Sequence, residues 1–214
     1  MNGPLLSRAL AFAALTLALS TSQAAPDAQF RPAFQLFNQA SAGDKAAVDA
    51  AADAFATLLQ AEPASPVLMA YSGASTAMKA RTTMLPWKKM GYAEDGLAML
   101  DKALALLTPA HDAIGQHRTP ASLETRFVAA STFLAVPEFM HRGARGNTLL
   151  AEVLASPLLA QSPLPFQSAV WMCAGAQAAK ENRVADARRF FEQVVQSGAP
   201  QAEQARVALQ GLPS

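Results

Sequence analysis

The sequence predicts an all-α fold, and three observations support this prediction. Alanine is abundant, alternating runs of β-branched residues are missing, and apolar residues recur at helical spacing along most of the 214-residue chain. Proline and glycine interrupt these segments at intervals, as expected where helices end. A repeated unit of paired helices is therefore the first architecture to test.

The N-terminus has the pattern of a cleavable secretory signal peptide, residues 1–24. A short segment ending at Arg8 is followed by the uncharged run 9–19 and then by small polar residues. Ser22 and Ala24 provide the small side chains that signal peptidase requires, so cleavage is expected directly after Ala24. A retained membrane anchor is the alternative, but the run has only about half of the roughly 20 residues needed to cross a bilayer.

Residues 25–214 are expected to form one exported helical domain with no membrane span after cleavage. A lipid anchor would need a cysteine at the cleavage site, and the only cysteine is Cys173, in the apolar run 170–174. Removal of residues 1–24 takes Arg8 from the 17 Lys and Arg residues, which leaves 16 against 16 Asp and Glu residues. This balance argues against nucleic acid or anionic lipid as the main partner. We expect a periplasmic location and a buried Cys173.

The C-terminal third has the clearest repeated pattern, over a helix pair at residues 165–198. Large, small and aromatic side chains follow the spacing of two closely packed antiparallel helices, at Trp171, Ala174, Gly175, Ala178, Val184, Ala187, Phe191 and Val194. Gly175 and Ala187 are the small residues expected where the two helix axes cross. Gly198 ends the second helix, and residues 200–211 are predicted to form a terminal helix.

The same pattern fits the N-terminal half, where pairs are predicted at residues 30–63 and 65–109. The matching positions are Ala51, Phe55, Leu58 and Pro63 in a second helix, and Met69, Ser72, Gly73 and Thr76 in the first helix of the next pair. The second helix of that pair carries Gly96. Between Gly73 and Gly96 there are about eleven residues more than the standard repeat allows.

The middle pair, at residues 119–159, departs most from the pattern. Residues 123–134 have helical periodicity, Pro137 interrupts it, and residues 143–146 are expected to form a loop before the second helix begins. The diagnostic small and aromatic positions are missing. We therefore expect a degenerate pair with a long polar turn.

The matches at residues 51–73 and 171–200 resemble tetratricopeptide repeats. This resemblance implies a right-handed α-solenoid of antiparallel helix pairs, whose concave face holds a peptide or helix of another protein without a cofactor or chemistry of its own. Residues 70–142 also resemble an uncharacterised group of exported bacterial repeat proteins. Recurring features of that group are an arginine, a Pro-aromatic-Lys segment and a Gly-Leu-x-x-Leu-Asp stretch, here Arg81, Pro86-Trp87-Lys88 and residues 96–101.

A candidate recognition surface lies in the segment 80–90, which a minimal repeat would not need. The residues that mark it are Arg81, Met84, Trp87, Lys88, Lys89 and Met90, with Tyr92 close behind. Trp and Arg are enriched in interface hot spots, and Met adapts to irregular partners. The alternative is that Trp87 and Met90 pack a longer loop against the helices while the cations are solvated.

A second candidate cluster lies near the break at Pro137. Its members are Arg126, Glu138, His141, Arg142 and Arg145. Together with the segment 80–90 they would form a pocket for a carboxylate or a peptide terminus, because Arg presents a planar fork to such groups. The alternative is intramolecular pairing, of Glu138 with one of the arginines and of Asp101 with Arg81 or Lys102.

No catalytic or metal-binding motif is recognised. His111, His117 and His141 are the only histidines and lack metal-ligand spacing on one helical face, and Cys173 has no histidine near it in the sequence. The sequence therefore predicts a binding or scaffold protein of the cell envelope with a protein or peptide partner. A periplasmic protein that binds a small molecule or peptide terminus through the arginines is the alternative. An enzyme of unrecognised type is a third, and the oligomeric state stays open.

Overall fold

The computed structural model describes residues 27–114 and 118–213, and within these residues the chain is helical without β-strands. An isolated bridge between Ile114 and Pro120 is the one β-type contact there. The all-α prediction is confirmed. The signal peptide predicted at residues 1–24 lies outside the described residues, as does His117. No helix in the described part of the chain combines the length and the apolar character needed to span a membrane.

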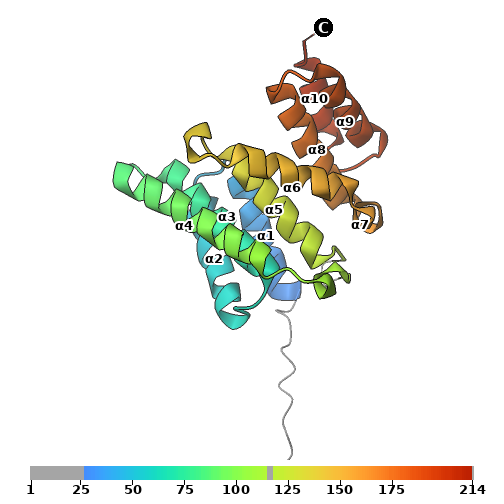
Figure 1. Cartoon of the computed structure of the whole chain (residues 1–214). Helices are drawn as coiled ribbons and strands as arrows, with labels where there is room; N and C mark the ends of the chain where they lie inside the picture. Colours follow the sequence, from blue (N-terminus) through green and yellow to red (C-terminus); the bar gives the residue numbers. More distant parts are fainter. Residues whose placement is uncertain (1–26, 115–117, 214) are drawn as a thin grey trace, which may run out of the picture.

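Ten α-helices and two short 3₁₀ helices follow one another in the described residues. They are α1 (Asp27–Ser41), α2 (Ala47–Ala61), α3 (Pro66–Thr82), α4 (Pro86–Ala105), η1 (Pro109–Asp112), α5 (Ala121–Ala135), η2 (Glu138–Met140), α6 (Gly143–Ala155), α7 (Pro157–Gln161), α8 (Leu164–Lys180), α9 (Val184–Gln196) and α10 (Ala202–Gln210). The predicted pairs correspond to α1 with α2, α3 with α4, α5 with α6 and α8 with α9, and the two helices of each are in contact, but α2 packs against α3 as extensively as against α1. Figure 1 shows α8, α9 and α10 at one end of the molecule, beyond α1 to α6.

Local sequence signals explain where several helices begin and end. Ser65 caps α3, because its hydroxyl accepts a hydrogen bond from the backbone N–H of Leu68, and Pro66 occupies the first turn. After α9, Gly198 adopts φ of 67°, a conformation that glycine tolerates without a steric penalty. These residues fix the turns that fold each helix back on its neighbour.

Glycines allow the helices of three pairs to approach closely. A Cβ on Gly96 would lie 2.5 Å from the carbonyl oxygen of Gly73, and one on Gly175 would lie 2.5 Å from the Phe191 ring. The middle pair has the same device, since a Cβ on Gly146 would lie 2.8 Å from the side chain of Leu134. The middle pair therefore has a small residue at its helix contact, although the repeat pattern does not mark it. The prediction of a loop at residues 143–146 was wrong, because α6 already begins at Gly143.

The extra residues between Gly73 and Gly96 lengthen two helices and do not form a long loop. Arg81 lies in the last turn of α3, Trp87 lies in the first turn of α4, and only residues 83–85 connect them. The alternative in which Trp87 packs this segment against the helices is wrong, because its side chain is 71% exposed.

Buried apolar side chains of the described residues form three clusters. The largest joins side chains of α1 to α8, including the fully buried Phe55 and Phe133. A second cluster forms around Phe191 and holds α9 and α10 against α8, and a small third one lies between α1 and α2. The largest core thus fixes α1, α3, α5 and α8 relative to one another, and these four helices also form the candidate site.

Candidate functional site

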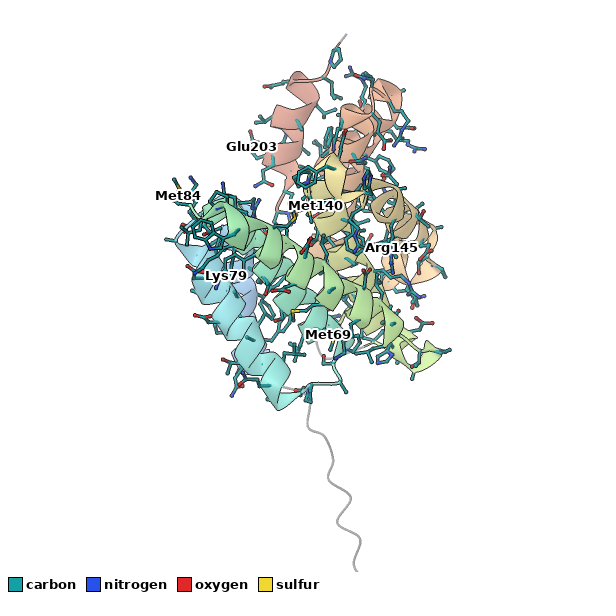
Figure 2. The ribbon with its side chains drawn as sticks, turned by 60° about the vertical axis from the view of Figure 1, so that its left-hand side comes forward. Met69, Lys79, Met84, Met140, Arg145 and Glu203 are labelled. Carbon is teal, nitrogen blue, oxygen red and sulfur yellow. The ribbon has the colours of Figure 1, made fainter. Side chains whose placement is uncertain are left out.

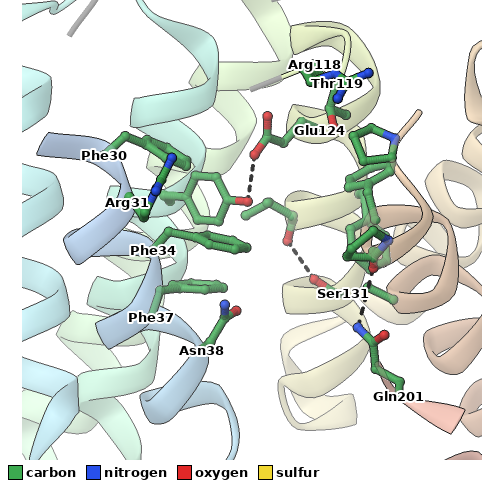
Figure 3. Close-up of a pocket in the computed structure, with 17 residues that line it drawn as sticks. Phe30, Arg31, Phe34, Phe37, Asn38, Arg118, Thr119, Glu124, Ser131 and Gln201 are labelled. Atoms are coloured by element: carbon green, nitrogen blue, oxygen red, sulfur yellow. Dashed lines mark hydrogen bonds between the residues drawn. The ribbon is translucent and has the colours of Figure 1, made fainter. Parts of the chain in front are cut away.

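An open cavity of about 530 Å³ lies between the first helices of the four predicted pairs. Its lining comes from α1, α3, α5 and α8, with Gln201 at the start of α10 on the far side. Figure 3 shows Phe30, Phe34 and Phe37 on one side of this cavity and Gln201 on the other. We refer to it as the aromatic groove.

The wall formed by α1 is a row of three phenylalanines. Phe30, Phe34 and Phe37 are spaced by four and three residues, so they lie on one face of the helix. Each ring packs edge-on against Tyr71 of α3, at centroid distances of 5.6, 5.7 and 4.9 Å. Phe34 and Phe37 stay half-buried, so part of each ring faces the cavity.

The floor of the groove contains a buried polar contact. The Tyr71 hydroxyl donates a 2.8 Å hydrogen bond to the carboxylate of Glu124 on α5, and the two residues are only 4% and 5% exposed. Burial raises the pKa of Tyr71 well above its ordinary value, and the charge of Glu124 and the hydrogen bond to it act in the same direction. Tyr71 therefore stays protonated at neutral pH and holds the carboxylate at the groove.

The opposite wall combines a second aromatic pair with amide and hydroxyl groups. Phe127 of α5 packs edge-on against Phe166 of α8 at 5.4 Å. The side chain of Gln201 donates to the carbonyl oxygen of Pro165 at 3.4 Å and accepts a short hydrogen bond from the Ser168 hydroxyl. This wall is thus held in place by contacts between α5, α8 and the start of α10.

Polar side chains stand around the rim. Arg31, Asn38 and Arg118 line the cavity and are exposed. Apolar surface in the centre with a few hydrogen-bonding groups around it is typical of ligand sites.

A second cavity, of about 280 Å³, continues the aromatic groove along α3. Phe37 and Ser131 line both cavities, and the second one extends to Arg81 and Pro137. From Tyr71 to Arg81 is ten residues along α3, or about 15 Å of helix. This length would accommodate a short peptide segment.

The residues of the first candidate surface are only partly associated with the groove. Arg81 lines its second cavity and reaches the carbonyl oxygen of Ala40 at 3.5 Å. Tyr92 is half-buried, and the ammonium group of Lys79 lies over its ring, 5.3 Å from the ring centre. Trp87, Lys88 and Lys89 line neither cavity and are exposed at the start of α4.

The structure does not bring the second candidate cluster together as a pocket. Arg142 and Arg145 both pair with Asp101, at 2.8 and 2.9 Å, so the expected pairing of Asp101 with Arg81 or Lys102 was wrong. Arg126 lies 3.7 Å from Glu152.

The position of Arg126 separates it further from the other arginines. Arg142 and Arg145 lie over the ring of Phe133. Phe133 is seven residues from Arg126 along α5, or about 10 Å of helix. Glu138 and His141 are exposed around η2. The cluster therefore divides into two separate ion-paired groups and two exposed side chains.

Cys173 and the metal-ligating side chains are the other candidates for chemistry in the described residues. Burial raises the pKa of the Cys173 thiol to about 11, so little thiolate forms at neutral pH. The described residues contain no group of three or more His, Cys, Asp or Glu side chains placed to hold a metal ion.

Sequence reasoning did not identify the residues that dominate the groove. The sequence does indicate Phe30, Phe34 and Phe37, because three phenylalanines on one face of a helix are more than packing against a single partner helix requires. Glu124 is not indicated, since a single acid near the start of a helix is ordinary.

Comparison of the chain with models of protein families, with curated proteins and with solved structures yields no match. The fold and the site define the protein as all-helical, with an aromatic groove along α3. Any narrower assignment rests on the groove itself.

Proposed function

We propose that this chain is an exported, tetratricopeptide-like binding protein of the cell envelope, and that the aromatic groove holds a segment of a protein partner. The observation that carries the proposal is the origin of the lining, since α1, α3, α5 and α8 all contribute to one cavity. In a right-handed solenoid of helix pairs, the first helices form the concave surface that such proteins use for binding. The signal-like N-terminus supports the location.

The chemistry of the groove favours an apolar peptide segment. The half-buried faces of Phe34, Phe37 and Phe127 offer aromatic surface to aliphatic or aromatic side chains. The amides of Asn38 and Gln201 supply donors and acceptors for peptide groups.

A small apolar molecule is the second candidate ligand, because 530 Å³ lies within the usual range of small-molecule pockets, about 300 to 1,000 Å³. A pocket formed by Arg126 and Arg142 has less support, since both arginines are already paired with acids.

The test begins with a displayed library of random peptides, selected on the processed chain, residues 25–214. Selected peptides are synthesised with a fluorophore, and their affinity is measured by anisotropy for the native protein and for Phe34→Ala and Phe127→Ala. We expect enriched peptides with apolar side chains, and a loss of affinity of about fivefold or more for each variant, because a truncated aromatic contact costs about 1 kcal/mol or more.

Trp87→Ala is the matched control, since it removes an exposed aromatic side chain that lines neither cavity. Equal binding by Phe34→Ala and native protein would exclude the aromatic groove as the site. A selection without enrichment, combined with stabilisation of the native protein by an apolar small molecule, would favour the second candidate.

A further inference from the structure

The tip of the α3–α4 hairpin exposes an unusual group of apolar side chains. Met84, Leu85, Trp87 and Met90 are 87%, 38%, 71% and 42% exposed. They are four of the eight large hydrophobic residues that are exposed in the described part of the chain. We refer to these four residues, with Lys88 and Lys89, as the α3–α4 tip. Exposed apolar groups this concentrated mark interaction sites.

The tip lies in a stretch of the chain that is rich in cations and free of acids. From Pro63 to Ala93 there is no Asp or Glu, whereas the chain as a whole is nearly neutral. Within this stretch Lys79 pairs with Asp49 at 3.1 Å, but Lys88 and Lys89 are exposed and form no ion pair with a described residue. Lys88 and Lys89 therefore form a small group of exposed cations beside the apolar side chains of the tip.

The geometry holds the tip at the outside of the molecule. Only residues 83–85 join the two helices, and Pro86 occupies the first turn of α4. Trp87 and Met90 are three residues apart and share a face of α4. Figure 2 shows Met84 at the outer edge of the ribbon. The close contact of Gly73 with Gly96 braces the hairpin behind the tip.

We propose that the α3–α4 tip docks the protein on the surface of an anionic lipid bilayer. Tryptophan is enriched at the interface between hydrocarbon and headgroups, and lysines beside it reach anionic headgroups while their methylene stems cover apolar surface. Methionine and tryptophan are also enriched in protein interfaces, but lysine is depleted from them. A protein interface therefore fits the tip less well than a bilayer does. Here two unpaired lysines lie among the apolar residues.

This inference goes beyond the proposed function and does not depend on it. The second cavity of the groove ends at Arg81, two residues before the residues 83–85 that join α3 to α4. Docking through the tip would therefore place that end of the groove beside the membrane surface.

Vesicle flotation tests the proposal with the processed chain, residues 25–214, because the apolar run 9–19 would itself bind lipid. The probes are vesicles of one part phosphatidylglycerol to three parts phosphatidylethanolamine, and vesicles of phosphatidylcholine alone. We expect binding to the anionic vesicles, loss of binding in the double variant Met84→Ser/Trp87→Ala, and a decrease of about fivefold for each lysine replaced in Lys88→Gln/Lys89→Gln.

Two variants match these changes elsewhere on the surface. Val207→Ser removes an apolar side chain that is 62% exposed, and Lys180→Gln/Arg188→Gln removes two exposed cations; both should bind as the native protein does. Tryptophan emission should shift to the blue on binding, except in Trp87→Phe.

Absence of the native protein from the floated anionic vesicles would overturn the proposal, as would unchanged binding by Met84→Ser/Trp87→Ala. A cross-linker at position 84 that captures a protein in the absence of vesicle binding would assign the tip to a protein partner instead. Phe34→Ala should leave flotation unchanged, so failure of the groove and failure of the tip are distinguishable.

Discussion

The hydroxyl of Tyr71 donates a 2.8 Å hydrogen bond to the carboxylate of Glu124, across 53 residues of sequence. This contact joins α3 to α5 beneath the aromatic groove, and both residues are buried. A buried carboxylate is stable in the folded protein only if such partners satisfy it.

Tyr71→Phe should therefore destabilise the protein by about 2 kcal/mol, the usual value for a hydrogen bond to a charged group. Urea denaturation monitored by circular dichroism measures the change. Tyr92→Phe is the control and should have little effect, because the ring of Tyr92 contacts Lys79 without a hydrogen bond in the described structure. Equal stability of native protein and Tyr71→Phe would show that the contact contributes nothing.

Gly96→Ala should be strongly destabilising. Its Cβ would lie 2.5 Å from the carbonyl oxygen of Gly73 and 2.6 Å from the backbone nitrogen of Ala77. Backbone atoms cannot move aside, so the helices must separate, at a cost of about 3 kcal/mol or more. The melting temperature measures this.

Gly91→Ala provides the opposite control in the same helix. A Cβ there would have no neighbour within 4 Å, and alanine favours helix over glycine by about 0.5 to 1 kcal/mol. Gly91→Ala should raise the melting temperature. A comparable decrease in both variants would contradict the close crossing of α3 and α4.

The stability of the protein should fall as pH rises from 9 to 10, through Cys173. Burial raises the pKa of its thiol from 9.0 to about 11, so in this window the unfolded chain loses a proton that the folded chain retains. Stability then decreases with pH, by about 1 kcal/mol over this interval. In Cys173→Ala this part of the decrease should vanish. The same slope in both proteins would show that the thiol is accessible to water.

Asp101→Asn should destabilise the protein by about 1 kcal/mol, and less at high salt, because its partners Arg142 and Arg145 are partly exposed. Glu152→Gln should be nearly neutral, since Arg126 lies 3.7 Å away and Glu152 is half-exposed. Chemical denaturation at two salt concentrations compares them. A larger loss of stability for Glu152→Gln than for Asp101→Asn would contradict this prediction, because the Arg126 pair would then contribute more than the pairs of Asp101.

The sequence was most informative about contacts within a helix pair. Gly73, Gly96 and Gly175 were selected as repeat positions from their spacing alone, and each one faces the partner helix of its pair. Close packing of adjacent helices requires a small residue at a fixed position, so the requirement is visible in the sequence.

Contacts between pairs could not be predicted in the same way. Asp101 meets Arg142 across 41 residues, and the groove combines α1 with α8 and Gln201. The faces of two pairs that come into contact depend on the angle between the pairs. No short-range spacing of residues in the sequence indicates that angle. The same limit hid the role of Glu124, whose partner lies on another pair.

The central claim is that a peptide occupies the aromatic groove, and hydrogen exchange of the free and peptide-bound protein tests it most directly. A peptide from the display selection should slow amide exchange in residues 30–37, 71–81 and 124–131, which belong to three of the four helices around the groove. Residues 184–196 of α9, which line neither cavity, should exchange as in the free protein. Protection in α9, or at the α3–α4 tip with none in residues 30–37, would contradict the account.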